Sequence, residues 1–434
     1  MRRCRKLLLL PVLALLLVLC GCGYDASVEE LFTLPRMAEG YTGLAQKLDE
    51  LITQGYEYAS PTGGRNIQSV QMADLDGDGR QEALAFFRRS GDEKPLKIFV
   101  FHMEDDAYQH FCTIESSGTA VDSVYYQDLT GDGHRELIVG WRISADVQTV
   151  AVYTVEREPV VLMSSGYSRF VMQDLNGDGI PSLLVLRTGE DSLPAAEFYG
   201  WQDGQMGVAY RTTLSSTMAS VNRGSLVSGK MDEDTPALFI TGVDEKGVAV
   251  TDVLIYRVET GLVNVSLSGS SGISAFVNDY RQIAPQDIDG DGCIEIPSAD
   301  GVWSDEQTDG LFAWHRCSQQ GDLTLAAKTY HSTTCGWYFT IPESWWDWNV
   351  GSTVTSIQNE NQFTLTINDD PVLSIYTITG ENRENRSRMA GRIVLRRQTA
   401  TVYAGELYGA ADYYGMDEEL LRRCFNLAAG SWNN

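Results

Sequence analysis

The chain has 434 residues, of which 59 are acidic and 33 are basic, so its formal net charge is −26. So acidic a surface repels phosphate backbones, which excludes nucleic acid as a partner. The apolar share of 43% excludes general disorder, and the length allows one large domain and a smaller one.

Residues 1–21 have the pattern of a secretion signal. Basic residues at positions 2, 3, 5 and 6 precede an apolar run from Leu7 to Leu19, which is too short to span a bilayer as a helix. The run ends in Leu19-Cys20-Gly21-Cys22, which resembles a bacterial lipobox with Cys22 as the acceptor. The resemblance implies removal of residues 1–21, a lipid on Cys22, and anchoring to the bacterial cell membrane on its extracytoplasmic side. Because four positive charges and no acids are removed, the mature net charge becomes about −30.

Residues 22–55 are predicted to form a lipidated tether and a short helix. The helix is expected from Tyr41 to Gly55, where four apolar side chains fall on one face: Leu44, Leu48, Leu51 and Ile52.

A nine-residue acidic pattern recurs along the middle of the chain, and we call its copies the repeat loops. They begin at Asp74, Asp128, Asp174 and Asp287. Oxygen-bearing side chains stand at positions 1, 3 and 5, glycines at positions 4 and 6, and an acid at position 9 in every copy but the third. Hard cations with flexible coordination prefer this arrangement, and Ca²⁺ fits it best. Solvated Asp-Gly turns are the alternative, but the recurrence between alternating apolar runs disfavours it.

The spacing of the loops predicts a repeated fold. The first two intervals are 54 and 46 residues, and the third, 113 residues, is about twice as long. A degenerate copy is therefore expected near residue 230, where Asp232 and Asp234 remain but the glycines and the first acid are lost. We interpret it as a repeat without a metal. A period near 50 residues is typical of propellers and solenoids.

The second repeat shows what one unit contains. Short strands are predicted at 121–127, 136–141, 149–153 and 159–163, and the acidic loop joins the first two. Four short strands per unit are typical of a propeller blade, whereas a parallel β-helix uses much shorter repeats. We therefore expect a mainly β protein, with a β-propeller of about five four-stranded blades over residues 56–335.

The loops resemble the FG-GAP and VCBS-type repeats of calcium-binding β-propellers, the family of the integrin α-chain propellers. The resemblance implies metal ligands from each loop, with position 7 contributing its backbone carbonyl. The implied ligands are Asp74, Asp76, Asp78, Arg80 and Glu82; Asp128, Thr130, Asp132, His134 and Glu136; Asp174, Asn176 and Asp178; and Asp287, Asp289, Asp291, Cys293 and Glu295. The third loop has Ser182 at position 9, so weaker binding is expected there. Dockerins and EF-hands share the acidic start but continue into a helix, whereas apolar strand runs follow here.

Residues 336–434 are predicted to form a small α+β domain. Its opening, Phe339-Thr340-Ile341-Pro342-Glu343-Ser344-Trp345, resembles the PsbP and Mog1-like class of small domains. Strands are expected at 362–368, 372–377 and 392–403, and a helix at 416–428. Trp345, Trp346 and Trp348 are candidates for an exposed patch that contacts carbohydrate or lipid, although such clusters more often pack in a core.

Few other residues suggest chemistry. The cysteines after the lipobox lack Cys-x-x-Cys spacing; Cys317 and Cys335 are candidates for a disulfide, and the pairing of the set stays open: Cys112, Cys293, Cys317, Cys335 and Cys424. No nucleophile elbow or phosphate loop is present. The favoured function is non-catalytic binding or adhesion to a protein or glycan at the cell surface. The alternatives are a hydrolase or polysaccharide lyase that uses the propeller funnel, and a scaffold for the C-terminal domain.

Overall fold

The computed structural model describes residues 39–428 except 106, 203, 270, 280–281 and 301–308. The signal segment and Cys22 lie outside the described residues, so the lipobox stays a prediction. No described helix is long and apolar enough to cross a membrane.

The described chain is mainly β, as expected, and consists of antiparallel sheets that follow one another in sequence. The first sheet contains β1 (Glu57–Tyr58), β2 (Val70–Ala73), β3 (Glu82–Arg88), β4 (Leu96–Glu104) and β5 (Ala107–Ser116). The second contains β6 (Ala120–Gln127), β7 (Glu136–Arg142), β8 (Gln148–Tyr153) and β9 (Val161–Gly166). The four strands expected in this repeat are thus confirmed.

Three further sheets extend the series. The third contains β10 (Arg169–Gln173), β11 (Ser182–Thr188), β12 (Pro194–Gln202) and β13 (Gln205–Thr213). Helix α3 (Met218–Arg223) leads into the fourth, with β14 (Ser225–Lys230), β15 (Pro236–Val243), β16 (Val248–Arg257), β17 (Gly261–Asn264) and β18 (Val277–Asp279). The fifth contains β19 (Ile296–Ala299), β20 (Gly310–Cys317), β21 (Leu323–Ser332), β22 (Trp337–Thr340) and β28 (Phe425–Leu427).

The sheets stack face to face because their central strands are apolar on both sides. In β11, Leu183 and Val185 pack against the second sheet, whereas Leu184 and Leu186 pack against the fourth. Successive side chains of a strand point to opposite faces, so a continuous apolar run indicates a strand buried on both sides. The same alternation joins the first sheet to the second and the fourth to the fifth.

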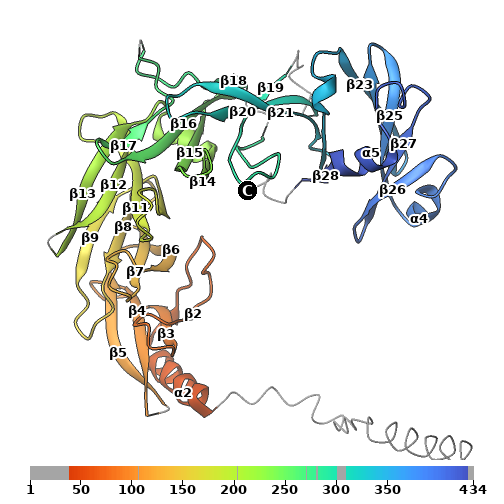
Figure 1. Cartoon of the computed structure of the whole chain (residues 1–434). Coiled ribbons are helices and arrows are strands. Elements are labelled where there is room, and N and C mark those ends of the chain that lie inside the picture. Colours follow the sequence, from red (N-terminus) through yellow and green to blue (C-terminus); the bar gives the residue numbers. More distant parts are fainter. Residues whose placement is uncertain are drawn as a thin grey trace, which may run out of the picture.

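The stack is an open arc, and both of its ends are covered. Helix α2 (Glu39–Thr53) packs Leu44 and Leu48 on the outer face of the first sheet, beside Phe87 and Phe99. In Figure 1, α2 and the C-terminal sheet lie at opposite ends of the arc, with β2 and β6 on its concave side and β5, β9 and β13 on its convex side. In a closed ring, another sheet would pack on the outer face of the first sheet, but α2 covers this face. The sheets therefore stack without closing into the ring that the resemblance implied.

The C-terminal unit contains one sheet, in the order β23 (Val350–Ile357), β24 (Glu360–Ile367), β25 (Asp370–Thr379), β27 (Thr401–Leu407) and β26 (Arg392–Arg397). Its short helices are η1 (Glu343–Trp345), α4 (Arg383–Arg386) and α5 (Glu418–Cys424). The strand expected at 392–403 is two strands, because the chain reverses at residues 398–400 so that β26 pairs with β27. The helix expected to reach residue 428 ends at Cys424, because the next residues pair with β22 as β28.

The expected boundary at residue 336 falls inside the fifth sheet, since β22 and β28 both belong to it. An apolar core joins this sheet to the C-terminal unit, and Trp345 is fully buried in it with its indole N–H donated to the Tyr414 carbonyl. Trp346 is partly buried and Trp348 is exposed, so the three tryptophans do not form one surface patch. All five cysteines of the described chain are free, including Cys317 and Cys335.

Candidate metal sites in the repeat loops

Each repeat loop is a tight turn organised by its first aspartate. In the first loop, Asp74 accepts hydrogen bonds from the backbone N–H groups of Gly77 (2.8 Å) and Gly79 (3.2 Å). Both glycines have positive φ angles, 74° and 86°, which glycine adopts without steric cost. The same pair of bonds recurs at the first aspartate of the other three loops: Asp128, Asp174 and Asp287.

Position 9 connects the loop to the strand that follows it. Glu82 is 2% exposed, and its Oε2 accepts the N–H of buried Leu75 at 2.7 Å. Glu136 and Glu295 make the corresponding bonds to Leu129 and Ile288. In the third loop, Ser182 cannot reach back in this way, and the N–H of Leu175 bonds to the Gln173 carbonyl instead.

The loops lie along one edge of the stack. The N–H of Arg135 in the second loop donates to the Leu75 carbonyl in the first at 2.6 Å, and the N–H of Ile294 in the last donates to the Lys230 carbonyl in the degenerate copy at 2.8 Å. Neighbouring acidic loops are therefore in direct contact, which adds their negative charges along this edge.

The first loop brings its acids together. One oxygen from each of Asp74, Asp76 and Glu82 lies within 4.8 Å of the others. The Oε1 atom of Glu82 is buried and makes no hydrogen bond to any described residue. Burial raises the pKa of Glu82, and the N–H of Leu75 opposes this rise. A buried acceptor without a donor is costly, and a hard cation among these oxygens would satisfy it.

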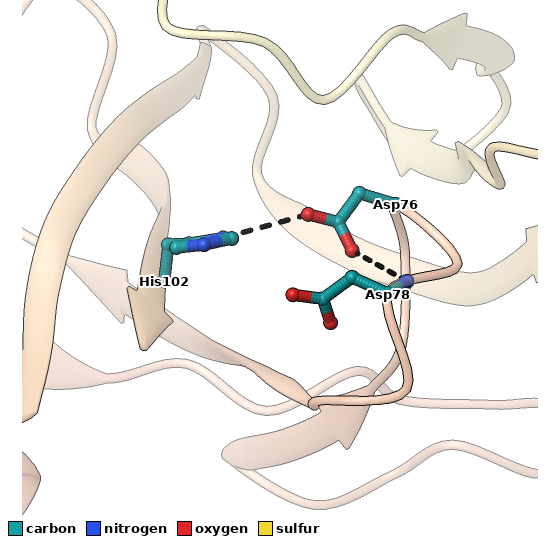
Figure 2. Close-up of side chains that lie close together, drawn as sticks. All are labelled: Asp76, Asp78 and His102. Carbon is teal, nitrogen blue, oxygen red and sulfur yellow. Dashed lines mark hydrogen bonds and ion pairs between the residues drawn. The ribbon is translucent and has the colours of Figure 1, made fainter. Parts of the chain in front are cut away.

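A histidine from the neighbouring strand adds to the first loop. His102 on β4 places Nδ1 3.3 Å from Glu82 Oε1 and 3.8 Å from Asp76 Oδ2. Figure 2 shows its ring directed at the carboxylate of Asp76, with Asp78 beside it. The imidazole thus stands at the margin of the acidic group, where it can serve as a further ligand when neutral or as a counter-charge when protonated.

The second and third loops are arranged differently. The Thr130 hydroxyl donates to Glu136 Oε1 at 3.3 Å, and the Asn176 amide donates to Asp178 Oδ2 at 2.7 Å. Among the described residues, neither loop gathers three acidic side chains as closely as the first. Their implied ligands are therefore present but engaged with one another.

The last loop gathers Asp287, Asp289 and Asp291 and also contacts a basic side chain. Arg316 on β20 forms ion pairs with Asp289, Asp291 and Glu295. Burial raises the pKa of Glu295 to about 7, against the contacts with Ile288 and Arg316.

His102 and Arg316 did not stand out in the sequence, because each lies far from its loop along the chain. Strand register provides the missing signal. Ala83 pairs with Phe101, so the next residue of β4, His102, lies opposite Glu82. Ile296 pairs with His315, so the next residue of β20, Arg316, lies opposite Glu295. Knowledge of this pairing would have identified both.

The degenerate copy keeps a buried apolar residue at position 2 and loses the tight turn. Met231 is fully buried, as is typical of position 2, whereas the loop is shortened and β15 begins at Pro236. Lys230 donates to the Glu233 carbonyl at 2.9 Å, and Asp232 accepts from the N–H groups of Asp234 and Thr235.

A cavity of about 520 Å³ lies beside the first loop, between β2, β6 and β10. Its apolar residues include Val70, Met72 and Met172, and Tyr125 and Tyr126 also line it. Polar side chains contribute the rest: Asn66, Gln68, Gln71, Gln81, Gln127 and Arg135. No hydrogen bond joins the side chains of Gln68, Gln127 or Arg135 to another described residue, so their donors and acceptors are available to a ligand.

One serine–histidine contact bears on the catalytic alternative. Ser298 Oγ lies 3.4 Å from His315 Nδ1 and 3.3 Å from the Ala313 carbonyl, beside a cavity of about 110 Å³. The distance to the histidine is long for a hydrogen bond from a hydroxyl. Burial also lowers the pKa of His315, which weakens it as a base.

Comparisons with known proteins name no family. No family model matches the chain, and no curated protein matches it. A hypothetical protein from Leishmania major is 12% identical and covers 63% of this chain and 89% of its own, with a TM-score of 0.23. AofleA from Arthrobotrys oligospora is 9% identical and covers 74% of this chain and 90% of its own, with a TM-score of 0.25. Both scores are too low to support an argument about fold or function.

Proposed function

We propose that this chain is a calcium-stabilised binding protein, held at the bacterial cell surface by a lipid on Cys22, with repeats of the FG-GAP and VCBS type. The observation that carries the calcium assignment is the buried Glu82 Oε1, which makes no hydrogen bond to a described residue and has only the His102 ring 3.3 Å away, within the acidic group of the first loop. Calcium accepts carboxylate and carbonyl oxygens in flexible geometry, whereas magnesium demands a near-ideal octahedron.

In the first loop, the ion would be held by Asp74, Asp76, Asp78 and Glu82 together with the Arg80 carbonyl. When bound, it supplies positive charge that offsets the repulsion among these carboxylates. Because the loop joins β2 to β3 and also touches the second loop, this charge would stabilise the contact between the first two sheets.

We assign the ligand of the protein to the 520 Å³ cavity and favour a hydroxyl-rich glycan. Amide side chains such as Gln68 and Gln127 both donate and accept hydrogen bonds, which matches sugar hydroxyls. Val70, Met72 and Met172 offer an apolar surface for the C–H face of a sugar ring. The proposal includes no chemical step, and the hydrolase and lyase alternatives become outcomes of the test.

Calcium binding is tested by thermal melting of the full-length protein in detergent, with a calcium chelator or with millimolar calcium. A hundredfold excess of calcium over its Kd adds about 2.7 kcal/mol to the free energy of unfolding, so the melting temperature should rise. Asp76→Ala should remove about one bound ion in equilibrium dialysis, since Asp76 belongs to the acidic group. Glu245→Ala, at an exposed acid in a distant turn, is the control. Equal melting temperatures in the two buffers would refute the calcium assignment.

Ligand binding is tested on glycan arrays and cell-wall fractions, with product analysis in parallel. Gln127→Ala should weaken retention on a glycan, whereas Gln205→Ala, at an exposed glutamine outside the cavity, should not. Turnover of a polysaccharide would favour the enzyme alternative. Retention that persists in Gln127→Ala and Arg135→Ala would move the binding site away from this cavity.

A further inference from the structure

We propose that Arg316 is the built-in cation of the last repeat loop, so that this loop folds without calcium although its sequence matches the pattern of the first. The chain would thus contain two kinds of acidic loop, one that takes an ion and one that an arginine neutralises. This inference reverses the expectation that the sequence raises for Asp287, Asp289, Asp291, Cys293 and Glu295.

The contacts of Arg316 place its charge where an ion would lie. Its Nη2 atom is 3.2 Å from Asp289 Oδ2, 2.5 Å from Asp291 Oδ2 and 3.1 Å from Glu295 Oε1. Its Nε atom also donates to Glu295 Oε1, at 3.3 Å. Calcium would need the same oxygens at about 2.3–2.6 Å. An ion and a guanidinium cannot share this space, because like charges at such a distance repel strongly.

The residue opposite position 9 distinguishes the loops. Extending each strand pairing by one residue places His102 opposite Glu82, Thr154 opposite Glu136, Gly200 opposite Ser182, and Arg316 opposite Glu295. Threonine and glycine bring no charge, and histidine is charged only when protonated. Arginine is charged at every accessible pH and presents several donors in a rigid plane. The last loop is therefore the one of the four with a permanent internal cation opposite position 9.

The degenerate copy also has a basic side chain in its turn, although at a different position from Arg316. It has Lys230 where the other loops have their first aspartate, and the Lys230 ammonium donates to the Glu233 carbonyl of the same turn. A basic side chain thus supplies the positive charge of the turn in the fourth repeat as well. The two repeats nearest the C-terminal unit both carry such a side chain, whereas the second and third loops carry none at the corresponding positions.

Removal of Arg316 should expose an unbalanced acidic group. The Glu295 side chain is fully buried, and losing its partner leaves a buried acid beside Asp289 and Asp291 without a counter-charge. The vacated space has the oxygens of a calcium loop around it. Arg316→Ala should therefore lose stability in chelator and regain it in calcium, by acquiring an ion that the wild type does not hold.

The test counts calcium ions in the full-length protein by equilibrium dialysis and compares melting temperatures with and without chelator. Arg316→Ala should bind about one more ion than the wild type, and Asp289→Ala in the wild-type background should bind the same number. Arg316→Gln, which keeps the size and loses the charge, repeats the test should the alanine variant fold poorly. Arg211→Ala is the matched control, because Arg211 also pairs with an aspartate and has the same exposed fraction of 34%.

Loss of one ion in Asp289→Ala would overturn the inference, because it would show an ion in the last loop beside Arg316. So would an unchanged ion count in both Arg316 variants. The proposed function can fail without the inference. If the wild-type protein binds no calcium but the Arg316→Ala variant binds one ion, the calcium assignment of the proposed function is refuted and the inference about Arg316 is supported.

Discussion

At the scale of single residues, buried acids and bases determine how this fold responds to its solution. The position-9 glutamates could be predicted from the sequence as ligands, but their burial could not. Glu82 is enclosed because its strand is covered on both faces, and one of its oxygens makes no hydrogen bond to a described residue. An acid that a sequence pattern marks as a ligand is thus buried in three dimensions, where its charged form is costly unless a positive charge compensates it.

A buried histidine predicts acid sensitivity. His331 is fully buried between the rings of Phe312, Trp314 and Tyr338, and burial lowers its pKa to about 3. The unfolded chain takes up a proton below about pH 6.5, and the folded chain does not until near pH 3. Stability from this site is therefore complete above pH 6.5 and is lost as the pH falls, by about 2 kcal/mol at pH 5.

His331→Phe should remove this contribution. The free energy of unfolding is measured by urea titration at pH 7 and at pH 5. It should fall less from pH 7 to pH 5 in the His331→Phe variant than in the wild type. His134→Gln, at an exposed histidine, should keep the wild-type difference. If the wild type and His331→Phe show equal differences, the histidine is not the group responsible.

At the scale of elements, helix α2 covers one end of the stack. The sequence predicted this helix and the apolar side chains that make it amphipathic. It did not show that Ile52 would be exposed while Leu44 and Leu48 are buried, because that depends on the angle at which the helix meets the first sheet. The adjoining face of the sheet carries Phe87 and Phe99, which would otherwise be exposed to water.

Leu48→Ala should destabilise this end of the stack. A leucine truncated in a packed core loses about 2–5 kcal/mol, and the partial exposure of the helix favours the lower half of this range. The urea midpoint of unfolding should fall accordingly. Ile52→Ala, on the same helix but 44% exposed, should change the free energy of unfolding by less than about 0.5 kcal/mol. Equal effects of the two changes would mean that α2 does not cover the sheet as the structure shows.

At the scale of the whole molecule, the arc places helix α2 and the C-terminal sheet at opposite ends. Helix α2 lies at one end of the arc, and β2 and β6, which line the cavity, lie on its concave side (Figure 1). In our proposal, the lipid on Cys22 anchors the chain ahead of α2, and the cavity on the concave side is the site for the glycan.

Cys22→Ala should release the protein from the membrane. A lipid on Cys22 would anchor a chain in which no described helix can cross a bilayer, so the variant should move to the soluble or secreted fraction. Fractionation with metabolic labelling by a radioactive fatty acid measures both effects. Cys20→Ala is the control and should stay labelled and membrane-bound. Membrane-bound, lipid-labelled Cys22→Ala would contradict the lipobox assignment.

The sequence by itself determined the repeat, the strands of the second unit and the acidic loops, because these are local patterns of periodicity and turn chemistry. Only the tertiary structure decided that the sheets stack in an open arc, since this depends on α2 and the C-terminal unit covering the two ends. It also decided the difference between loops of one sequence type. His102 and Arg316 lie about 20 residues from the position-9 acids they face, and strand pairing alone brings the charges together.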